Sequence, residues 1–301
     1  MGFNLNHQND ETEFLLEKKL YQNESELSMR YRNNLPILDV MLEKFFNHFP
    51  NFTDHSLLHS MSIIHITNQL IGLEHLDALN EDAIYIYLMA TLLHDCGMGI
   101  RESDLNQFMA FMGFPSGEEI LDEDIPEVIR KYHQKISAGF VMKYWQILDI
   151  PDEKYALAIA RLCNGHRVAD LFDLENYPVD YEIRDGVTVN LAGLAALLRL
   201  ADELDIASDR NPDIIYAEKL MKNNNERSLV EFARHEAIHN VLFQADTHTI
   251  TVCAQSEDPA LKVAIEDCVA EVRKKMDYGR RVMTARGGLL YDYDTVEIEW
   301  E

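Results

Sequence analysis

Residues 83–97 read AIYIYLMATLLHDCG. Apolar side chains recur along this stretch at helical spacing, which predicts a buried helix that ends at Gly97. The pair His94-Asp95 lies in the last turn of that helix. Because two neighbouring side chains at a helix terminus can both reach one metal ion, the stretch predicts a polar site at the end of a core helix.

The same helical spacing continues on both sides of this stretch, through most of the first 220 residues. Further helices are expected at about residues 37–46, 57–71, 125–145, 155–163 and 191–204. Asp54 and Asn80 stand where the N-caps of two helices would lie. Connections are expected near residues 114–117 and 149–151, and in the longer polar segment 173–186. The first part of the chain is therefore predicted to be a helical domain.

Composition changes after about residue 225. Two strands joined by a short turn are expected at residues 240–246 and 249–255, followed by a helix at about 259–286 and a last strand at 295–300. The predicted fold class is therefore mainly α. A helical bundle is expected over residues 1–225, with a small C-terminal α+β appendage over residues 226–301.

The bulk composition is that of an ordinary globular protein. Of the 301 residues, 47% are hydrophobic and 26% are charged. No apolar run approaches eighteen residues, and the N-terminus lacks the basic and apolar regions of a secretory signal. The four cysteines are widely spaced, without a Cys-x-x-Cys pair. We therefore expect a cytoplasmic protein with reduced thiols and no membrane attachment.

The formal net charge of −25 repels polyanions. It argues against nucleic acid and anionic membranes as partners, although it does not exclude a local contact with nucleic acid. A small phosphorylated substrate is compatible with it, because a divalent metal and a few cations can reverse the field inside one pocket. The basic run within residues 273–286 could contact a nucleotide, an RNA or a partner's acidic face, or it could be a salt-bridged helix surface.

The predicted bundle carries four further candidate ligands: His59, His133, His166 and Asp202. Asp202 lies in the apolar run LLRLADELD, residues 197–205, where a buried carboxylate is costly without a cation. A shared metal ion supplies that cation. Imidazole and carboxylate ligands suit Mn²⁺, Fe, Zn²⁺ or Co²⁺, and an oxygen-rich shell also accepts Mg²⁺. If two ions are bound, Asp95 is placed to bridge them.

Three short motifs surround four of these residues. His59 begins His-Ser-x-x-Ile, His94-Asp95 lies in Leu-Leu-His-Asp-x-Gly, and Asp202 lies in Leu-Arg-Leu-Ala-Asp-x-Leu-Asp. Together, over about residues 50–210, the motifs resemble the HD superfamily of metal-dependent phosphohydrolases. The resemblance implies an HD-type helical bundle in which these four residues bind metal.

His133 and His166 match two extra histidines that binuclear members of this superfamily place between the His-Asp pair and the last Asp. The resemblance therefore implies one or two divalent ions, with these histidines serving the second. His55, four residues before His59, stays open as a contact to substrate or to a ligand. A softer resemblance connects the chain with bacterial HD domains found beside heat-shock-chaperone-like ATPases or in stress and conflict systems.

The resemblance also implies an enzyme that hydrolyses a small phosphorylated molecule, with a nucleotide or cyclic nucleotide as the expected substrate. A bound metal would lower the pKa of water to supply the nucleophile. Catalytic roles are expected for Asp95, His133 and Arg167. Four cations near the ligands are candidates for phosphate contact: Arg130, Lys131, Lys135 and Arg199. Each could instead be a solvated helix-surface charge, and Glu203 and Asp205 could orient ligands or lie at the surface.

Two other functions fit the same ligands. Some HD-type proteins with six histidine and aspartate ligands use two irons for oxygenation, so a diiron oxygenase is one alternative. The other is a non-catalytic regulatory or interaction module in which the metal site is structural. Each of these functions leaves room for a protein partner or a homo-oligomer.

Overall fold

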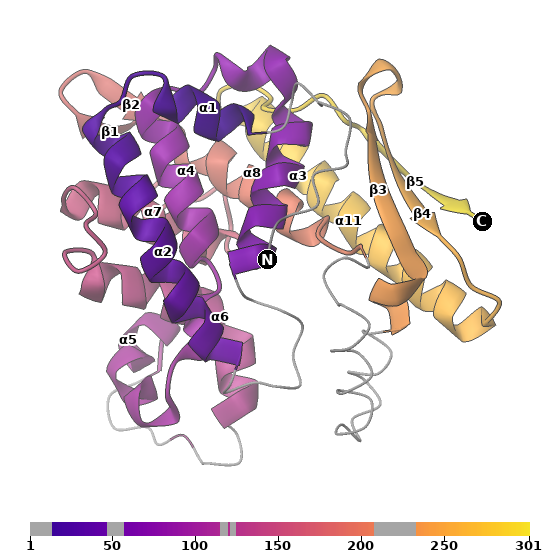
Figure 1. Cartoon of the computed structure of the whole chain (residues 1–301), viewed down its shortest axis with the longest axis horizontal. Coiled ribbons are helices and arrows are strands. Elements are labelled where there is room, and N and C mark those ends of the chain that lie inside the picture. The colour runs from indigo at the N-terminus through magenta and orange to yellow at the C-terminus, as the bar shows by residue number, and fades with distance from the viewer. Residues whose placement is uncertain (1–13, 47–56, 115–119, 121–124, 208–232) are drawn as a thin grey trace.

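The computed structural model describes residues 14–46, 57–114, 120, 125–207 and 233–301. Its first part is a helical bundle, and its last part is a three-stranded sheet beside one long helix (Figure 1). This confirms the predicted fold class, mainly α with a small α+β appendage. The predicted domain boundary near residue 225 and the predicted cap Asp54 lie outside the described residues.

The described part of the bundle contains α1 (Leu15–Tyr21), α2 (Glu26–Phe46), α3 (Leu57–Leu76), α4 (Glu81–Leu93), α5 (Met109–Met112), α6 (Ile125–Tyr144), α7 (Glu153–Gly165) and α8 (Leu191–Glu203). All the expected helices are present, whereas the short α1 and α5 were not predicted. Every residue from Asp82 to Leu93 is buried, as expected for a helix that is apolar on all sides. Asn80 caps α4 as predicted, because its side chain accepts a hydrogen bond from the Ala83 amide at 2.8 Å.

The prediction that the core helix continues to Gly97 was wrong. α4 ends at Leu93, and Cys96–Gly99 forms a 3₁₀ turn. The turn brings Gly97 against α6, where its amide donates to Ser137 Oγ at 2.8 Å. A Cβ at Gly97 would lie 2.3 Å from the His133 carbonyl oxygen, so only glycine permits this approach. The helix therefore stops early enough to place Asp95 on the turn facing α6.

The polar segment 173–186, expected as a connection, contains part of a short hairpin. β1 (Tyr181–Arg184) pairs antiparallel with β2 (Val187–Val189), and Gly186 in the turn has φ +72°. The sequence signal was the Asp185-Gly186 pair between alternating residues, a typical hairpin turn. The Arg184 guanidinium of this hairpin binds the buried Asp82 carboxylate of α4 at 2.9 Å, which fastens the hairpin to the bundle.

The C-terminal part follows its predicted order. β3 (Ile238–Gln244) and β4 (Thr249–Ala254) are antiparallel, and β5 (Thr295–Trp300) joins β4 in parallel. A parallel neighbour needs a crossover connection, and α11 (Pro259–Ala285) supplies it. The resulting sheet has the order β3-β4-β5, with every residue of the central β4 buried.

The long helix α11 packs along α8, so it connects the appendage to the bundle (Figure 1). Residues of β4, α11 and α8 belong to one continuous hydrophobic core, for example Val252, Val269 and Leu197. A second, smaller core joins residues 98–112 to α6 and includes Phe108 and Ile129. Among the described residues, no helix combines the length and the apolar character needed to cross a bilayer.

Candidate metal centre

The six predicted ligands converge at one place in the bundle, with three of them at a first metal position. His59 of α3, His94 at the end of α4 and Asp202 of α8 offer atoms that lie within 4.8 Å of one another. The Asp202 Oδ1 atom is 3.4 Å from His59 Nε2 and 3.6 Å from His94 Nε2. Three helices that are far apart in sequence thus contribute one ligand each.

A second metal position lies beside the first and uses α6 and α7. His133 of α6 and His166 at the end of α7 place their Nε2 atoms 3.3 Å apart. These atoms are 3.2 Å and 3.7 Å from Asp95 Oδ1. The described residues give this position three protein ligands, since Asp95, His133 and His166 form the second compact group.

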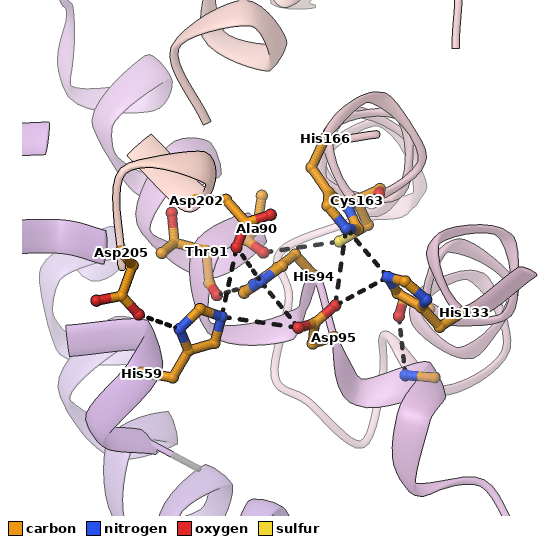
Figure 2. A network of polar contacts seen from close by, with 12 residues as sticks. His59, Ala90, Thr91, His94, Asp95, His133, Cys163, His166, Asp202 and Asp205 are labelled. Atoms are coloured by element: carbon orange, nitrogen blue, oxygen red, sulfur yellow. Dashed lines mark hydrogen bonds and ion pairs between the residues drawn. The ribbon is translucent and has the colours of Figure 1, made fainter. Parts of the chain in front are cut away.

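Asp95 lies between the two positions and faces both (Figure 2). Its Oδ2 atom is 3.3 Å from His94 Nε2 and 3.7 Å from His59 Nε2, while its Oδ1 atom faces the other two histidines. A carboxylate with one oxygen directed to each of two ligand groups is the geometry of a bridging ligand. An ion at the first position could therefore take four protein ligands and an ion at the second could take three, with the carboxylate shared.

All four histidines are oriented through their Nδ1 atoms. His94, His133 and His166 each donate from Nδ1 to the carbonyl oxygen three residues earlier, at 2.6–2.8 Å. A carbonyl oxygen can only accept, so the Nδ1 atom carries the proton and Nε2 presents a lone pair to the site. This is the tautomer that a metal ligand needs, and the outer hydrogen bond fixes the plane of the ring.

His59 is oriented by a carboxylate instead. Its Nδ1 donates to Asp205 Oδ2 at 2.6 Å, and Ser62 donates to the other oxygen of Asp205 at 2.6 Å. The Asp205 side chain is 3% exposed. From the sequence, Asp205 could either orient a ligand or lie at the surface. In the structure it is buried and hydrogen-bonded to His59. Ser62 was not predicted; its signal is its position three residues after His59 on the same helix face.

The distances fit metal ions. Bonds from nitrogen and oxygen ligands to Zn²⁺ are about 2.0–2.2 Å long, so neighbouring ligand atoms on one ion lie roughly 2.8–3.6 Å apart. The nitrogen–oxygen separations in the centre are 3.2–3.7 Å. The Nε2 atom of His94 is buried without a hydrogen-bond partner, which is costly unless a metal ion takes its lone pair. The donor set thus fits one or two divalent ions.

Burial and charge prepare these groups for metal binding. Burial lowers the pKa of His166 to about 3, so its imidazole stays neutral and available as a ligand. Burial also raises the pKa of Asp202, but the imidazoles of His59 and His94 beside its Oδ1 atom outweigh burial and hold that pKa well below its usual range. Burial lowers the pKa of His94, yet Asp95 and Asp202 beside it outweigh this effect and raise it. The carboxylates attract positive charge strongly, as a cation site should.

Three of the predicted phosphate-contacting cations lie on α6, around His133. The Arg130 guanidinium pairs with Glu127 at 2.7 Å, and its backbone carbonyl orients His133. Lys131 and Lys135 lie near the ring of Tyr132, with Nζ 5.0 Å and 5.7 Å from its centroid. Their contacts with substrate stay predictions.

Arg199 and Arg167 lie near the end of α7. The buried Arg199 guanidinium donates to the carbonyl oxygens of Gly165, at 2.6 Å, and Ala169, at 2.7 Å. Its charge stabilises the carboxyl end of α7, next to His166, so the observed bonds are those of a residue that positions a ligand. Arg167 is exposed, and its predicted catalytic role stays a prediction. His55 lies outside the described residues.

Residues 49–280 match the family model HD-CE. The match covers most of the chain and all six ligands, so the chain belongs to the HD-CE family. This confirms the predicted HD-type domain. Neither the search of curated proteins nor that of solved structures gave a match. The family and the histidine-aspartate cluster together fit an HD-type hydrolase whose cluster could hold a metal ion.

Proposed function

We propose that this chain is a metal-dependent hydrolase of a phosphoester or phosphoanhydride, with a nucleotide or cyclic nucleotide as substrate. The observation that carries the proposal is Asp95, which directs one oxygen to each of two histidine pairs. Two adjacent divalent ions held by these residues would supply a water nucleophile near neutral pH and neutralise the phosphoryl oxygens. The family match and the intact six-ligand set support an active centre over a purely structural one.

The residues of the chain have distinct tasks in this proposal. His59, His94 and Asp202 would hold the first ion, and His133 and His166 would hold the second, with Asp95 shared. Because the second position offers one protein ligand fewer, an ion there would leave more room for water and for the phosphoryl group. Arg167, exposed beside His166, is placed to bind a substrate oxygen and offset charge that develops on the leaving group.

In this proposal the metal is Mn²⁺, Fe, Mg²⁺, Co²⁺ or Zn²⁺. The substrate is a small phosphorylated molecule, and the site of action is the cytoplasm. A protein partner and a homo-oligomer remain predictions. The choice between hydrolysis and dioxygen chemistry depends on the metal, since the same ligands suit iron.

The test combines metal content with turnover. The anaerobically purified chain and its Asp95→Ala variant would be analysed by plasma mass spectrometry. Both would then be assayed against mono-, di-, tri- and cyclic nucleotides with Mn²⁺, Mg²⁺, Co²⁺ or Fe²⁺. We expect metal and phosphate release in the parent chain and neither in the variant. The control is Asp246→Asn, an exposed aspartate of the β3–β4 turn, which should change nothing.

Three results would contradict the proposal. Full turnover by Asp95→Ala would remove the assignment of the site. Iron with oxygen consumption and no phosphate release would establish the oxygenase alternative. A bound metal without turnover of any nucleotide would favour the non-catalytic module.

A further inference from the structure

The ligand shell is most open at Asp202. The Asp202 side chain is 24% exposed, whereas the Asp95 side chain is 9% exposed and the first-position histidines are 1% exposed. Asp202 lies in the last turn of α8, the helix that packs against α11. A substrate that reaches the ions from this side therefore passes the end of α8 and the residues of α11 beside it.

The pairing of α8 with α11 shows which residue lies there. A Cβ at Gly279 would lie 3.7 Å from the Ala196 side chain, and the Arg199 guanidinium lies 4.9 Å from the ring of Tyr278. The two helices run in opposite directions, so the turn of α11 that carries Lys275 lies beside the last turn of α8, which carries Asp202 and Glu203. Burial raises the pKa of Glu203, as do the charges of Asp202 and Glu271, and the charges of Lys275 and Arg167 partly oppose that rise.

The other basic residues on α11 or just after it have neighbours of their own. Lys262 and Arg281 lie over the rings of Trp300 and Tyr278. Arg273, Arg280 and Arg286 donate to the backbone carbonyls of Val296, Tyr293 and Phe172. Lys274 binds Glu271 on the same helix. Within the described residues, neither Lys275 nor Arg167 donates a hydrogen bond, forms a close ion pair or lies over an aromatic ring, and the charges of both act on Glu203.

We propose that Lys275 and Arg167 form a second anion-binding subsite at the rim of the metal centre. It would hold a phosphoryl group of the substrate next to the one that reacts at the ions. The subsite rests on the proposed function and narrows it to a substrate with two or more linked phosphoryl groups, such as a nucleoside diphosphate or triphosphate. A monophosphate has no second phosphoryl group to bind at this subsite.

Charge explains why such a subsite requires the appendage. The chain carries a net charge of −25, and Asp95, Asp202, Asp205 and Glu203 gather around the centre. The ions neutralise charge at the reacting phosphorus only. A second phosphoryl group needs its own cations, because the uncompensated acidic field would repel it. Arg167 from the bundle and Lys275 from α11 approach this rim from two parts of the chain.

The experiment compares binding of pyrophosphate and inorganic phosphate to the Mn²⁺-loaded full chain by calorimetry. The variants are Lys275→Gln, Arg167→Gln and the matched control Lys274→Gln, one position away on the same helix. We expect Lys275→Gln and Arg167→Gln each to weaken pyrophosphate binding about tenfold, as the loss of one charge-assisted hydrogen bond does. Phosphate binding and the melting temperature should change little, and Lys274→Gln should match the parent chain. Lys275→Arg should restore most of the affinity.

Several outcomes overturn the subsite. Equal affinity of the parent chain for phosphate and pyrophosphate would do so, as would equal effects of Lys275→Gln and Lys274→Gln. The result also separates the two proposals. A Lys275-dependent preference for pyrophosphate without turnover of any nucleotide would remove the hydrolase function and keep the subsite. Turnover of a nucleotide without a Lys275-dependent preference for pyrophosphate would keep the hydrolase function and remove the subsite.

Discussion

The two metal positions share Asp95 but are supported differently. The first position lies among α3, α4 and α8 in the main core, has a carboxylate of its own in Asp202, and has His59 oriented by the Asp205 carboxylate. The second position lies between α6 and α7, and among the described residues its histidines are oriented by backbone carbonyls alone. More ligands and more negative charge predict tighter binding at the first position. The weaker second position is the one suited to exchange water and substrate.

Removal of one histidine from each position should have the largest effect. In His133→Ala we expect one ion per chain, because the first position keeps all its ligands, whereas His94→Ala should retain less metal. Turnover should fall by about a thousandfold or more in both, since both ions act on the same phosphoryl group. Plasma mass spectrometry and the nucleotide assay measure this, with the exposed His239→Ala as control. Equal metal loss in His133→Ala and His94→Ala would contradict the predicted difference in metal affinity between the two positions.

Asp205→Asn should weaken the first position alone. The amide keeps an acceptor for His59 but loses the charge that strengthens the imidazole as a ligand, and such changes reduce metal affinity about 10–100-fold. Competitive titration with a chelating dye resolves the two affinities. Ser62→Ala, which removes one bond to Asp205, should have a smaller effect in the same direction. A loss confined to the second position would contradict the assignment.

Gly97→Ala should affect the second position first. Its Cβ would lie 2.3 Å from the His133 carbonyl oxygen and 2.8 Å from the Ser137 amide, so α6 must move away from Asp95. Overpacking of this kind costs about 1–3 kcal/mol of stability. We expect a lower midpoint in urea and one ion per chain. Ser137→Ala removes the hydrogen bond without the clash and should keep both ions. Two ions in Gly97→Ala would show that α6 adapts without moving His133.

A pH experiment distinguishes the stability of the fold from metal binding at the centre. Burial raises the pKa of Asp82, but bonds from Arg184 and Tyr155 outweigh it, so the pKa is lower in the folded chain. The carboxylate thus stabilises the fold above the unfolded pKa, about 3.9, and this contribution is lost as pH falls through the folded pKa. Arg184→Met should therefore lower the free energy of unfolding at pH 7. On acidification that free energy should fall less than it does in the parent chain.

The measurement is urea denaturation from pH 7 to pH 3, with metal content at pH 7. Both positions should keep their ions, because Arg184 contacts neither. The surface pair variant Arg101→Met is the control and should show the parent's pH profile. A steeper acid loss in Arg184→Met than in the parent would contradict the direction of the Asp82 shift.

The helices and the ligands could be predicted because their signals are local. Apolar spacing marks α4 and α8, and the order of His59, His94-Asp95 and Asp202 carries the family resemblance. The early end of α4 could not be predicted, since it depends on how closely α6 approaches Gly97. The backbone carbonyls that orient the histidines could not be predicted either, because every residue type carries a backbone carbonyl.

The placement of Lys275 shows the same limit at a larger scale. It is one of several basic residues in residues 273–286, and the sequence does not distinguish it from Lys274. The packing of α11 on α8 separates the two, since Lys274 is exposed and binds Glu271, whereas Lys275 is half-buried and its charge acts on Glu203. Contacts between distant segments therefore decide which charged residues can serve the site.

Asp95 is proposed to bridge two ions. Diffraction at the manganese absorption edge from crystals grown with Mn²⁺ tests it most directly. We predict two anomalous peaks about 3.5–4 Å apart, as in other two-metal sites, with one oxygen of Asp95 on each peak. A single peak among His59, His94 and Asp202, with His133 and His166 bound to no metal, would contradict the account.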